Sequence, residues 1–444
     1  MASKKLIQPR TLKGFRDYLP AAMIPREWLV DTAKRVYRSF GFSPIDTPAL
    51  EYAEILLGKG GDENDRQVYQ FERGKRQLAM RFDLTVPLAR FVAQHEHELG
   101  LPFKRYHIGQ VWRGENTQRG RYREFMQCDF DTLGTESLMA DAETALVIYE
   151  LFRAIGFDAF TIRLNNRKVL NGLLESLALA EHAVPVLRAL DKLAKIGPDG
   201  VRAEMAETAG TTDAQSQAVL DFSALQGSNA EILDAVEPMV SGTELGRAGV
   251  AQLHEVLAYI AAGGVDDDFL QLDVSIARGL DYYTGTIFET FLGPLPDIGS
   301  VCSGGRYDDL ASTYTKSHIP GIGASLGLDR LLAAMTELGM LESVSTPAPV
   351  FIAYFSKTRG ADYGKLAMEL RRAGIGTEVY PAAKKLGEQL KYADRRGFRY
   401  ALVIGDEEWE SGRCQVKHLA TKQSDEVSQE ELLEHLGRLL ASQS

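Results

Sequence analysis

Residues 113–125 read Arg-Gly-Glu-Asn-Thr-Gln-Arg-Gly-Arg-Tyr-Arg-Glu-Phe and place four arginines within thirteen residues. A guanidinium stays charged at any working pH, and its planar set of N–H donors suits a pair of phosphate oxygens. The flanking residues, 103–112 and 125–133, alternate apolar with polar side chains and are rich in aromatic and β-branched types. We therefore predict a β-hairpin whose arginines either bind a polyphosphate or form a charged, solvated tip.

Even spacing within this hairpin groups its side chains by face. Arg113 and Glu115 leave the first strand, and Arg121 and Phe125 enter the second. Side chains two or four residues apart on a strand lie on the same face. An arginine and an aromatic ring on one face could hold the phosphate and the base of a nucleotide.

The chain has 444 residues and an ordinary globular composition, which suggests about two to four domains. It has no apolar run long enough to span a bilayer, and its first ten residues lack the apolar core of a secretory signal. The three cysteines, Cys128, Cys302 and Cys414, lie far apart in the sequence, as expected for a protein of a reducing compartment. The histidine pair His95 and His97 has no second pair of histidines or cysteines with which to bind a metal ion. We predict a cytoplasmic protein with no membrane partner and no metal-binding side chains.

The formal net charge of −11 excludes a uniformly basic surface. Two local basic stretches remain, at residues 113–125 and at residues 384–399 near the C-terminus. An enzyme that acts on a nucleic acid can be acidic overall and basic where it contacts its substrate. The charge balance is therefore compatible with a nucleic-acid substrate.

Changes in residue pattern divide the chain into five parts. Helical periodicity is clear at residues 25–40 and 137–153, whereas residues 168–262 are rich in Leu, Ala and Glu with almost no strand pattern. Strand and turn character returns at residues 270–289, and strands alternate with helices beyond residue 350. We predict a core in two parts (1–167 and 263–342), a helical insertion (168–262), a linker (343–349) and a small α/β domain (350–444).

Glycines and an arginine mark residues 321–332 as a second candidate site. Gly323 and Gly327 could leave the backbone open for a flat base, with Arg330 one turn into the following helix to bind a phosphate. The alternative is a strand and helix packed closely through glycine. Residues 302–309 are interpreted chiefly as a tight turn.

Two further segments have both a functional and a structural interpretation. Arg278 could neutralise a carboxylate or a phosphate beside the hydroxyls of Tyr282 and Tyr283, or these residues could belong to an ordinary hairpin. Asp83 and Thr85 could receive an ammonium group at the start of a helix, or could simply cap that helix. Neither segment decides between the two interpretations alone.

Taken together, these segments resemble a known family. Residues 47–51 (Thr-Pro-Ala-Leu-Glu), the 113–125 hairpin and residues 327–330 (Gly-Leu-Asp-Arg) occur in the order of the three signature motifs of class II aminoacyl-tRNA synthetases. Residues 278–285 (Arg-Gly-Leu-Asp-Tyr-Tyr-Thr-Gly) and 304–308 (Gly-Gly-Arg-Tyr-Asp) are similar to two segments specific to the histidyl-tRNA synthetases. The resemblance covers nearly the whole chain.

The resemblance implies an α+β fold. We expect an antiparallel six-stranded catalytic sheet flanked by helices, a helical insertion before the third motif and a C-terminal α/β anticodon-binding domain. It also implies a homodimer with Pro48 at the interface. The implied reaction activates L-histidine with ATP and Mg²⁺ to histidyl-adenylate and pyrophosphate, and then transfers histidine to the 3′ end of tRNA(His).

The resemblance also assigns roles to individual residues. The expected ATP-binding residues are Arg113, Glu115, Arg121, Phe125 and Arg330. The expected histidine-binding residues are Asp83, Leu84, Thr85, Arg113, Gln127, Asp131, Arg278, Tyr282 and Tyr283, of which Arg113 and Arg278 are also catalytic. Position alone suggests contacts of Gln118 and Arg119 with the acceptor stem of the tRNA. Lys384, Lys385 and Lys391 could face the anticodon stem or form a solvated helix face.

A different class of function fits the same core. A regulatory paralogue of histidine biosynthesis would bind histidine and transfer nothing, but such proteins lack the anticodon-binding domain. Here residues 350–444 are present, and Arg113, Arg278 and Arg330 are all in place. A class II synthetase for another amino acid is disfavoured by residues 278–283. The sequence therefore favours the ligase.

Overall fold

The computed structural model describes residues 7–58, 65–276, 282–341 and 345–441. The chain divides into two compact units, residues 1–16 with 29–338 and residues 17–28 with 339–444. Helix α1 (Pro20–Ser39) contains residues of both units and begins before the expected residue 25, so that Pro25 lies inside it.

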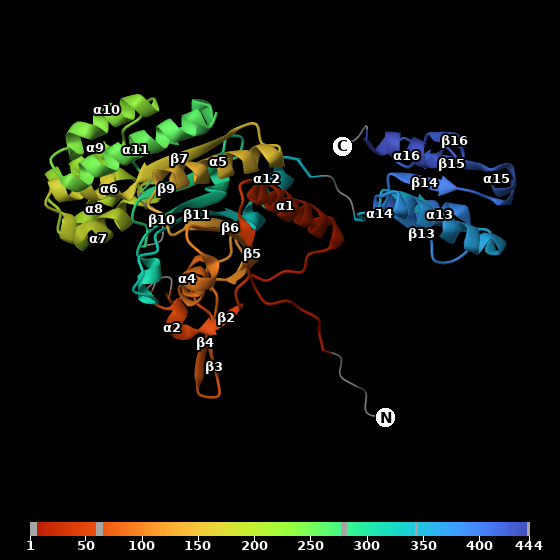
Figure 1. Cartoon of the computed structure of the whole chain (residues 1–444), viewed down its shortest axis with the longest axis horizontal. Coiled ribbons are helices and arrows are strands. Elements are labelled where there is room, and N and C mark those ends of the chain that lie inside the picture. Colours follow the sequence, from red (N-terminus) through yellow and green to blue (C-terminus); the bar gives the residue numbers. More distant parts are fainter. Residues whose placement is uncertain (1–6, 59–64, 277–281, 342–344, 442–444) are drawn as a thin grey trace. The chain divides into compact units, whose positions relative to one another are not determined.

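The first unit is built on an eight-stranded sheet in the order β1-β5-β6-β11-β10-β9-β7-β8 (Figure 1). The six consecutive strands from β5 to β7 are antiparallel, as expected for the catalytic sheet, and β1 and β8 add one short parallel strand at each edge. The bounds in sheet order are Ser43–Pro44, Phe103–Trp112, Glu124–Leu133, Gly321–Gly327, Cys302–Tyr307, Thr286–Leu292, Phe160–Asn166 and Leu270–Leu272.

The predicted hairpin is strands β5 and β6, which pair from Phe103–Leu133 to Trp112–Glu124. Even-numbered residues of β6 point into the core: the ring of Phe130 lies 5.0 Å from that of Tyr37 in α1, and the Tyr37 hydroxyl donates to the carbonyl of Cys128 at 2.9 Å. Odd-numbered residues of β6 therefore lie on the opposite face.

Helix α5 (Leu138–Ile155) confirms the helix expected from residue 137. The Ser137 side chain caps its first turn by accepting from the Met139 N–H. Gly156 ends it with φ +97°, in the left-handed region that glycine adopts without steric cost. Helix α12 (Leu328–Glu337) follows directly from β11.

The Leu-, Ala- and Glu-rich segment is helical, as expected (Figure 1). Its helices α6 to α11 span Arg167–Ser176, Ala183–Leu190, Leu193–Ala209, Asp213–Ser223, Asn229–Val240 and Glu244–Ala262. Helices α6 and α11 pack so closely that a Cβ on Gly172 would lie 2.4 Å from the Cα of Gly246. Glycine at this crossing permits the approach.

A small sheet of order β2-β4-β3 was not foreseen from the sequence. Its strands are Leu50–Tyr52, Arg76–Met80 and Gln70–Arg73, and helices α2 (Ala53–Leu56) and α4 (Thr85–Leu99) follow β2 and β4, respectively, in the chain. It places residues 81–84, which link β4 to α4, beside the main sheet, where the Trp112 N–H of β5 donates to the Arg81 carbonyl at 3.1 Å.

The second unit has its own five-stranded sheet, order β13-β12-β14-β15-β16, in which β13, β12 and β14 are parallel. In that order the strands are Thr377–Val379, Val350–Ile352, Tyr400–Val403, Arg413–His418 and Ser424–Ser428. Helices α13 to α16 span Gly360–Arg372, Leu386–Arg396, Asp406–Ser411 and Leu432–Ala441. The alternating pattern is thus confirmed, whereas β16 and α15 were not predicted.

Candidate active site

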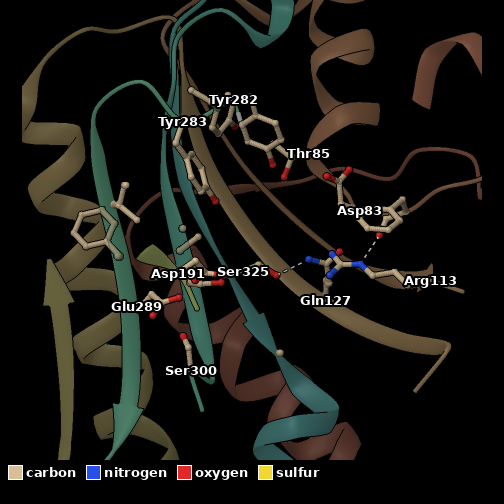
Figure 2. Close-up of a pocket in the computed structure, with 18 of the residues that line it drawn as sticks. Asp83, Thr85, Arg113, Gln127, Asp191, Tyr282, Tyr283, Glu289, Ser300 and Ser325 are labelled. Atoms are coloured by element: carbon tan, nitrogen blue, oxygen red, sulfur yellow. Dashed lines mark hydrogen bonds between the residues drawn. The ribbon is translucent and has the colours of Figure 1, made fainter. Parts of the chain in front are cut away.

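A cavity of about 960 Å³ in the first unit brings most of the expected site residues together (Figure 2). Its walls come from β6, β9, β10 and β11, from the starts of α4 and α12, and from insertion helices α6 to α8. The predicted residues that line it are Asp83, Thr85, Arg113, Glu115, Arg121, Phe125, Gln127, Asp131, Tyr282, Tyr283 and Arg330.

Other predicted residues lie elsewhere. Arg278 falls outside the described residues. The Leu84 side chain is fully buried and does not line the cavity, because it belongs to the packing at the start of α4. Pro48 is exposed. The proposed tRNA contacts Gln118, Arg119, Lys384, Lys385 and Lys391 are all exposed.

Arg113 lies between two aromatic rings at one end of the cavity. Its guanidinium carbon is 4.3 Å from the centre of the Phe82 ring and 5.1 Å from that of Phe125. Its Nε donates to the Phe82 carbonyl at 3.1 Å, so the side chain is fixed in direction (Figure 2). A cation held in this way needs little reorganisation when an anion arrives.

Two further arginines stand along the same wall. Arg121 Nη1 lies 3.9 Å from Glu115 Oε2, and Arg330 Nη1 donates to the Ser300 carbonyl. Gly120 lies against the start of α12, where a Cβ would come within 3.0 Å of the Arg330 Cα. The loop of the hairpin is therefore close to the helix that bears Arg330.

Asp83 both caps α4 and lines the cavity. Its Oδ1 accepts from the Val86 N–H at 3.0 Å, which confirms the structural interpretation of this segment. Burial raises the pKa of Asp83, while the Val86 N–H and Arg113 act in the opposite direction. Thr85 is hydrogen-bonded to Tyr282, so these two hydroxyls form one side of the cavity (Figure 2).

A polar floor runs along the odd-numbered residues of β6. Gln127 Nε2 donates to Ser325 Oγ of β11 at 2.8 Å (Figure 2), and Ser325 also hydrogen-bonds Asp129. Asp131 lies 2.6 Å from Arg105 Nη2 and accepts from the Tyr307 hydroxyl at 2.5 Å. Arg105, on β5, is completely buried.

Burial governs the acidity of these carboxyls. It raises the pKa of Asp129 to about 7, with nearby Arg105 acting against the shift and Asp131 adding to it. It also raises the pKa of Asp131, against the effects of Arg105 and Tyr307. The floor thus concentrates acceptor groups in a low-dielectric setting.

Sequence reasoning missed Arg105, Asp129, Ser325 and Tyr307. The even spacing that places Arg121 and Phe125 on one face of the strand also places Asp129 on that face, two residues after Gln127. This pattern was the available signal for Asp129. Arg105 faces Asp131 across the hairpin only in the observed register. No sequence pattern marked the insertion residues Arg188 and Asp191, which also line the cavity.

Residues 302–309, interpreted as a tight turn, begin instead with strand β10. Gly304 permits the pairing, because a Cβ there would lie 2.1 Å from the Gly323 carbonyl oxygen of β11. Arg306 then forms ion pairs with Asp141 and Asp308 and donates to nearby backbone carbonyls. This arginine anchors α5 to the sheet.

The described part of the chain contains neither a metal-binding cluster nor a membrane-spanning helix. No group of three or more His, Cys, Asp or Glu side chains there could hold a metal ion. No described helix is both long and apolar enough to cross a membrane.

Comparisons with known proteins agree with the motifs. The histidyl-tRNA synthetase family model matches residues 14–331, and the anticodon binding domain model matches residues 350–439. The chain is 62% identical over 424 residues to a histidine–tRNA ligase of Rhodopirellula baltica, covering 95% of this chain and 96% of that one. It is 46% identical over 422 residues to one of Wolinella succinogenes, covering 94% and 96%.

A solved structure extends this likeness to the fold. The histidyl-tRNA synthetase of Nostoc sp. PCC 7120 matches with a TM-score of 0.89 and 36% identity, over 98% of this chain and 100% of that one. These findings favour the ligase over the regulatory paralogue. The chain belongs to the histidyl-tRNA synthetase family, the class II aminoacyl-tRNA synthetases that ligate histidine to tRNA.

Proposed function

We propose that this cavity joins L-histidine to ATP, forming histidyl-adenylate and pyrophosphate, and then transfers histidine to the 3′ end of tRNA(His) with release of AMP. The observation that carries the proposal is the convergence on one cavity of residues from the 113–125 hairpin, from the tyrosine pair 282–283 and from residues 327–330. A pocket with aromatic walls, fixed arginines and a polar floor suits a nucleotide beside a polar amino acid.

The nucleotide would lie along the hairpin. Phe125 would stack on the adenine and Glu115 would accept from its amino group, while Arg121 and Arg330 would hold the outer phosphates. Attack of a carboxylate on the α-phosphate brings two anions together, so the reaction needs positive charge where they meet more than it needs a proton carrier. Arg113 would supply that charge, together with Arg278, which lies outside the described residues.

The amino acid would lie over the polar floor. Asp83 and Thr85 would receive its α-ammonium group, and the backbone at Leu84 would adjoin them. Gln127, Asp131, Tyr282 and Tyr283 would surround the imidazole. A pocket whose polar groups must all find partners rejects apolar amino acids by as much as ~10⁴-fold.

Magnesium would enter with ATP. The described residues hold no cluster of three metal-ligating side chains, so the phosphates themselves and water would supply most ligands. The ion would supply neutralisation of phosphate charge.

The remaining parts would serve tRNA binding and assembly. Gln118 and Arg119 at the hairpin tip would contact the acceptor end, and Lys384, Lys385 and Lys391 would face the anticodon stem. The working form would be a cytoplasmic homodimer with Pro48 at its interface. The domains would be the two-part core (1–167 and 263–342), the insertion (168–262), the linker (343–349) and the anticodon-binding domain (350–444).

ATP–pyrophosphate exchange with each standard amino acid in turn tests the proposal. We expect exchange with histidine alone, followed by charging of tRNA(His) when that tRNA is added. Histidine binding without exchange would support the regulatory paralogue, and exchange with another amino acid would overturn the assignment of the pocket.

A further inference from the structure

The segment that precedes α1 braces the hairpin loop from outside the cavity. This N-terminal segment, residues 10–16, forms neither helix nor strand. Its Gly14 carbonyl accepts from the Arg123 N–H at 2.8 Å, and the Arg123 carbonyl accepts from the Arg113 N–H at 2.9 Å. The backbone of Arg113 is therefore held, through Arg123, by a part of the chain that does not line the cavity.

The close approach of the N-terminal segment to the loop requires glycine at residue 14. Gly14 has φ +87°, in the left-handed region, and a Cβ there would lie 2.7 Å from Arg123 Cγ. At the other end of the loop, the Gly114 N–H donates to the Gln67 carbonyl at 2.7 Å. Both ends of the loop are thus anchored by backbone hydrogen bonds to segments distant in the sequence.

Arg16 is the residue of the N-terminal segment that joins the loop to α12. Its Nη1 donates to the Tyr122 hydroxyl at 2.8 Å, and its guanidinium carbon lies 4.1 Å from the centre of the Tyr122 ring. Its Nη2 donates to Asp329 Oδ1 at 3.2 Å. Asp329, in the first turn of α12, accepts through Oδ2 from the Met126 N–H of β6 at 2.9 Å. One guanidinium therefore bridges the loop and the start of α12.

This bridge differs from an ordinary surface ion pair, which contributes little. The Arg16 side chain is 35% exposed, but that of Asp329 is only 2% exposed. A buried carboxylate depends on its donors, so the loss of one is felt at its position. Tyr122 and Asp329 both line the cavity, and their neighbours in the chain are Arg121 and Arg330, respectively.

We propose that Arg16 is a positioning residue that sets the separation of Arg121 and Arg330. The inference rests on the proposed function, in which these two arginines hold the outer phosphates of ATP. One lies on the loop and the other on α12, so neither element fixes their separation alone. Gly120 lets the loop approach α12 but has no side chain to hold it there. Arg16 supplies that link and so preorganises the two cations for a polyphosphate.

Pyrophosphate exchange with Arg16→Ala tests the inference through the two Michaelis constants. KM for ATP should rise by roughly tenfold, the size expected for loss of a hydrogen bond between charged groups, with KM for histidine unaltered. A residue that served only stability would lower kcat, because less of the protein would be folded, and would leave both KM values unaltered. Arg10→Ala is the matched control, because Arg10 is an exposed arginine of the same segment and its loss should change neither KM.

Two further variants test how Arg16 acts. Arg16→Lys keeps the charge but loses the planar set of donors, so KM for ATP should lie about threefold above that of the parent protein. Tyr122→Phe removes the hydroxyl and keeps the ring, and should raise KM for ATP about threefold in the parent protein but not further in Arg16→Ala. Additive effects of Arg16→Ala and Tyr122→Phe would mean that the two residues act independently, which would overturn the bridge.

Calorimetric titration with ATP separates this inference from the proposed function. Arg16→Ala should raise the Kd for ATP about tenfold, whether or not exchange occurs. Absence of exchange by the parent protein with histidine would refute the proposed function, and the titration would still decide the inference. A parent protein that binds no ATP would overturn both.

Circular dichroism shows whether each variant is folded. If Arg16→Ala does not fold, Arg16→Lys and Tyr122→Phe give the same test, because each keeps part of the bridge. An unaltered KM and Kd for ATP in a folded Arg16 variant would overturn the inference. Equal increases in KM for ATP and for histidine would also overturn it, since they would indicate a general disturbance of the cavity.

Discussion

Asp129 and His107 face each other across the β5–β6 hairpin and have pKa values displaced in opposite directions. Burial raises the pKa of Asp129 to about 7. Burial, reinforced by Arg105 and Arg81, lowers the pKa of His107 to about 3. Both residues therefore favour their neutral forms inside the sheet.

These shifts affect stability with opposite signs. Between its unfolded value of ~3.9 and about 7, Asp129 holds a proton in the folded protein that the unfolded chain has lost, so stability falls as pH rises through this window. Below pH ~6.5 the His107 side chain takes up a proton in the unfolded chain but not in the folded protein. The free energy of unfolding therefore decreases as the pH falls from ~6.5 towards about 3.

Asp129→Asn isolates the effect of the Asp129 carboxyl on the pH dependence of stability, because the variant and the parent protein both keep His107. The substitution removes the group whose ionisation opposes folding, so the melting temperature of the variant relative to the parent should rise between pH 5 and pH 8. Each kcal/mol corresponds to roughly 2–4 °C in a domain of this size class. Thermal unfolding of the ligand-free proteins, followed by circular dichroism, measures the difference. A difference that does not vary with pH would mean that Asp129 is not buried as a neutral acid.

Strand β11 contains two glycines, Gly323 and Gly327, to which the sequence analysis gave the same role. Their surroundings in the structure differ. A Cβ on Gly323 would lie 2.3 Å from both Asp131 Oδ1 and the Phe130 carbonyl oxygen of β6. A Cβ on Gly327 would meet nothing closer than the Val301 carbonyl oxygen at 3.5 Å. Close packing therefore explains why residue 323 is glycine, whereas the absence of a side chain at Gly327 leaves free space at the wall of the cavity.

Alanine at each position gives a paired test. Gly327→Ala should fold normally and raise KM for ATP by about tenfold, because the added methyl group occupies space at the cavity wall where the adenine base would lie. KM for histidine should not change. Gly323→Ala should lower stability by ~1–3 kcal/mol and raise KM for histidine, because β6 must move. Pyrophosphate exchange and thermal unfolding check both variants. Equal effects on ATP and histidine in Gly327→Ala would contradict the placement of the base.

Periodicity predicted the elements that have strong local patterns and missed those fixed by distant contacts. The β5–β6 hairpin and α5 were readable because alternation, the Ser137 cap and Gly156 are all local. Strand β10 was taken for a turn because its glycines look like turn residues until the β10–β11 register places Gly323 opposite Gly305. The pairing of Arg105 with Asp131 likewise depends on register, which composition does not specify.

The site was predicted to a similar extent. The motif residues that line the cavity were named from the sequence, because a known pattern fixed their positions. Their partners, such as Tyr307 and Ser325, come from strands paired through the fold. Long-range pairing is the information that a single sequence lacks.

At the scale of the whole molecule, an apolar patch on the small sheet suggests an interface. Leu50, Tyr52 and Phe71 are 45%, 52% and 42% exposed. Tyr52 and Phe71 both lie opposite Leu78 of β4, and Leu50 is two residues from Tyr52, so the three side chains share one face. The patch lies two residues beyond Pro48 in the chain, and contiguous exposed apolar groups of this kind mark contact surfaces.

We therefore expect Phe71→Lys to weaken the proposed homodimer. A lysine at the centre of an apolar contact leaves a desolvated charge without a partner, which typically costs several kcal/mol. Sedimentation equilibrium of the parent protein should give twice the chain mass, and the variant should shift towards the chain mass at the same concentration. Met139→Lys is the control, because Met139 is 55% exposed on α5, away from the small sheet, and its replacement should leave the mass unaltered. A dimer that survives Phe71→Lys would place the interface elsewhere on the molecule, and a monomeric parent protein would exclude it.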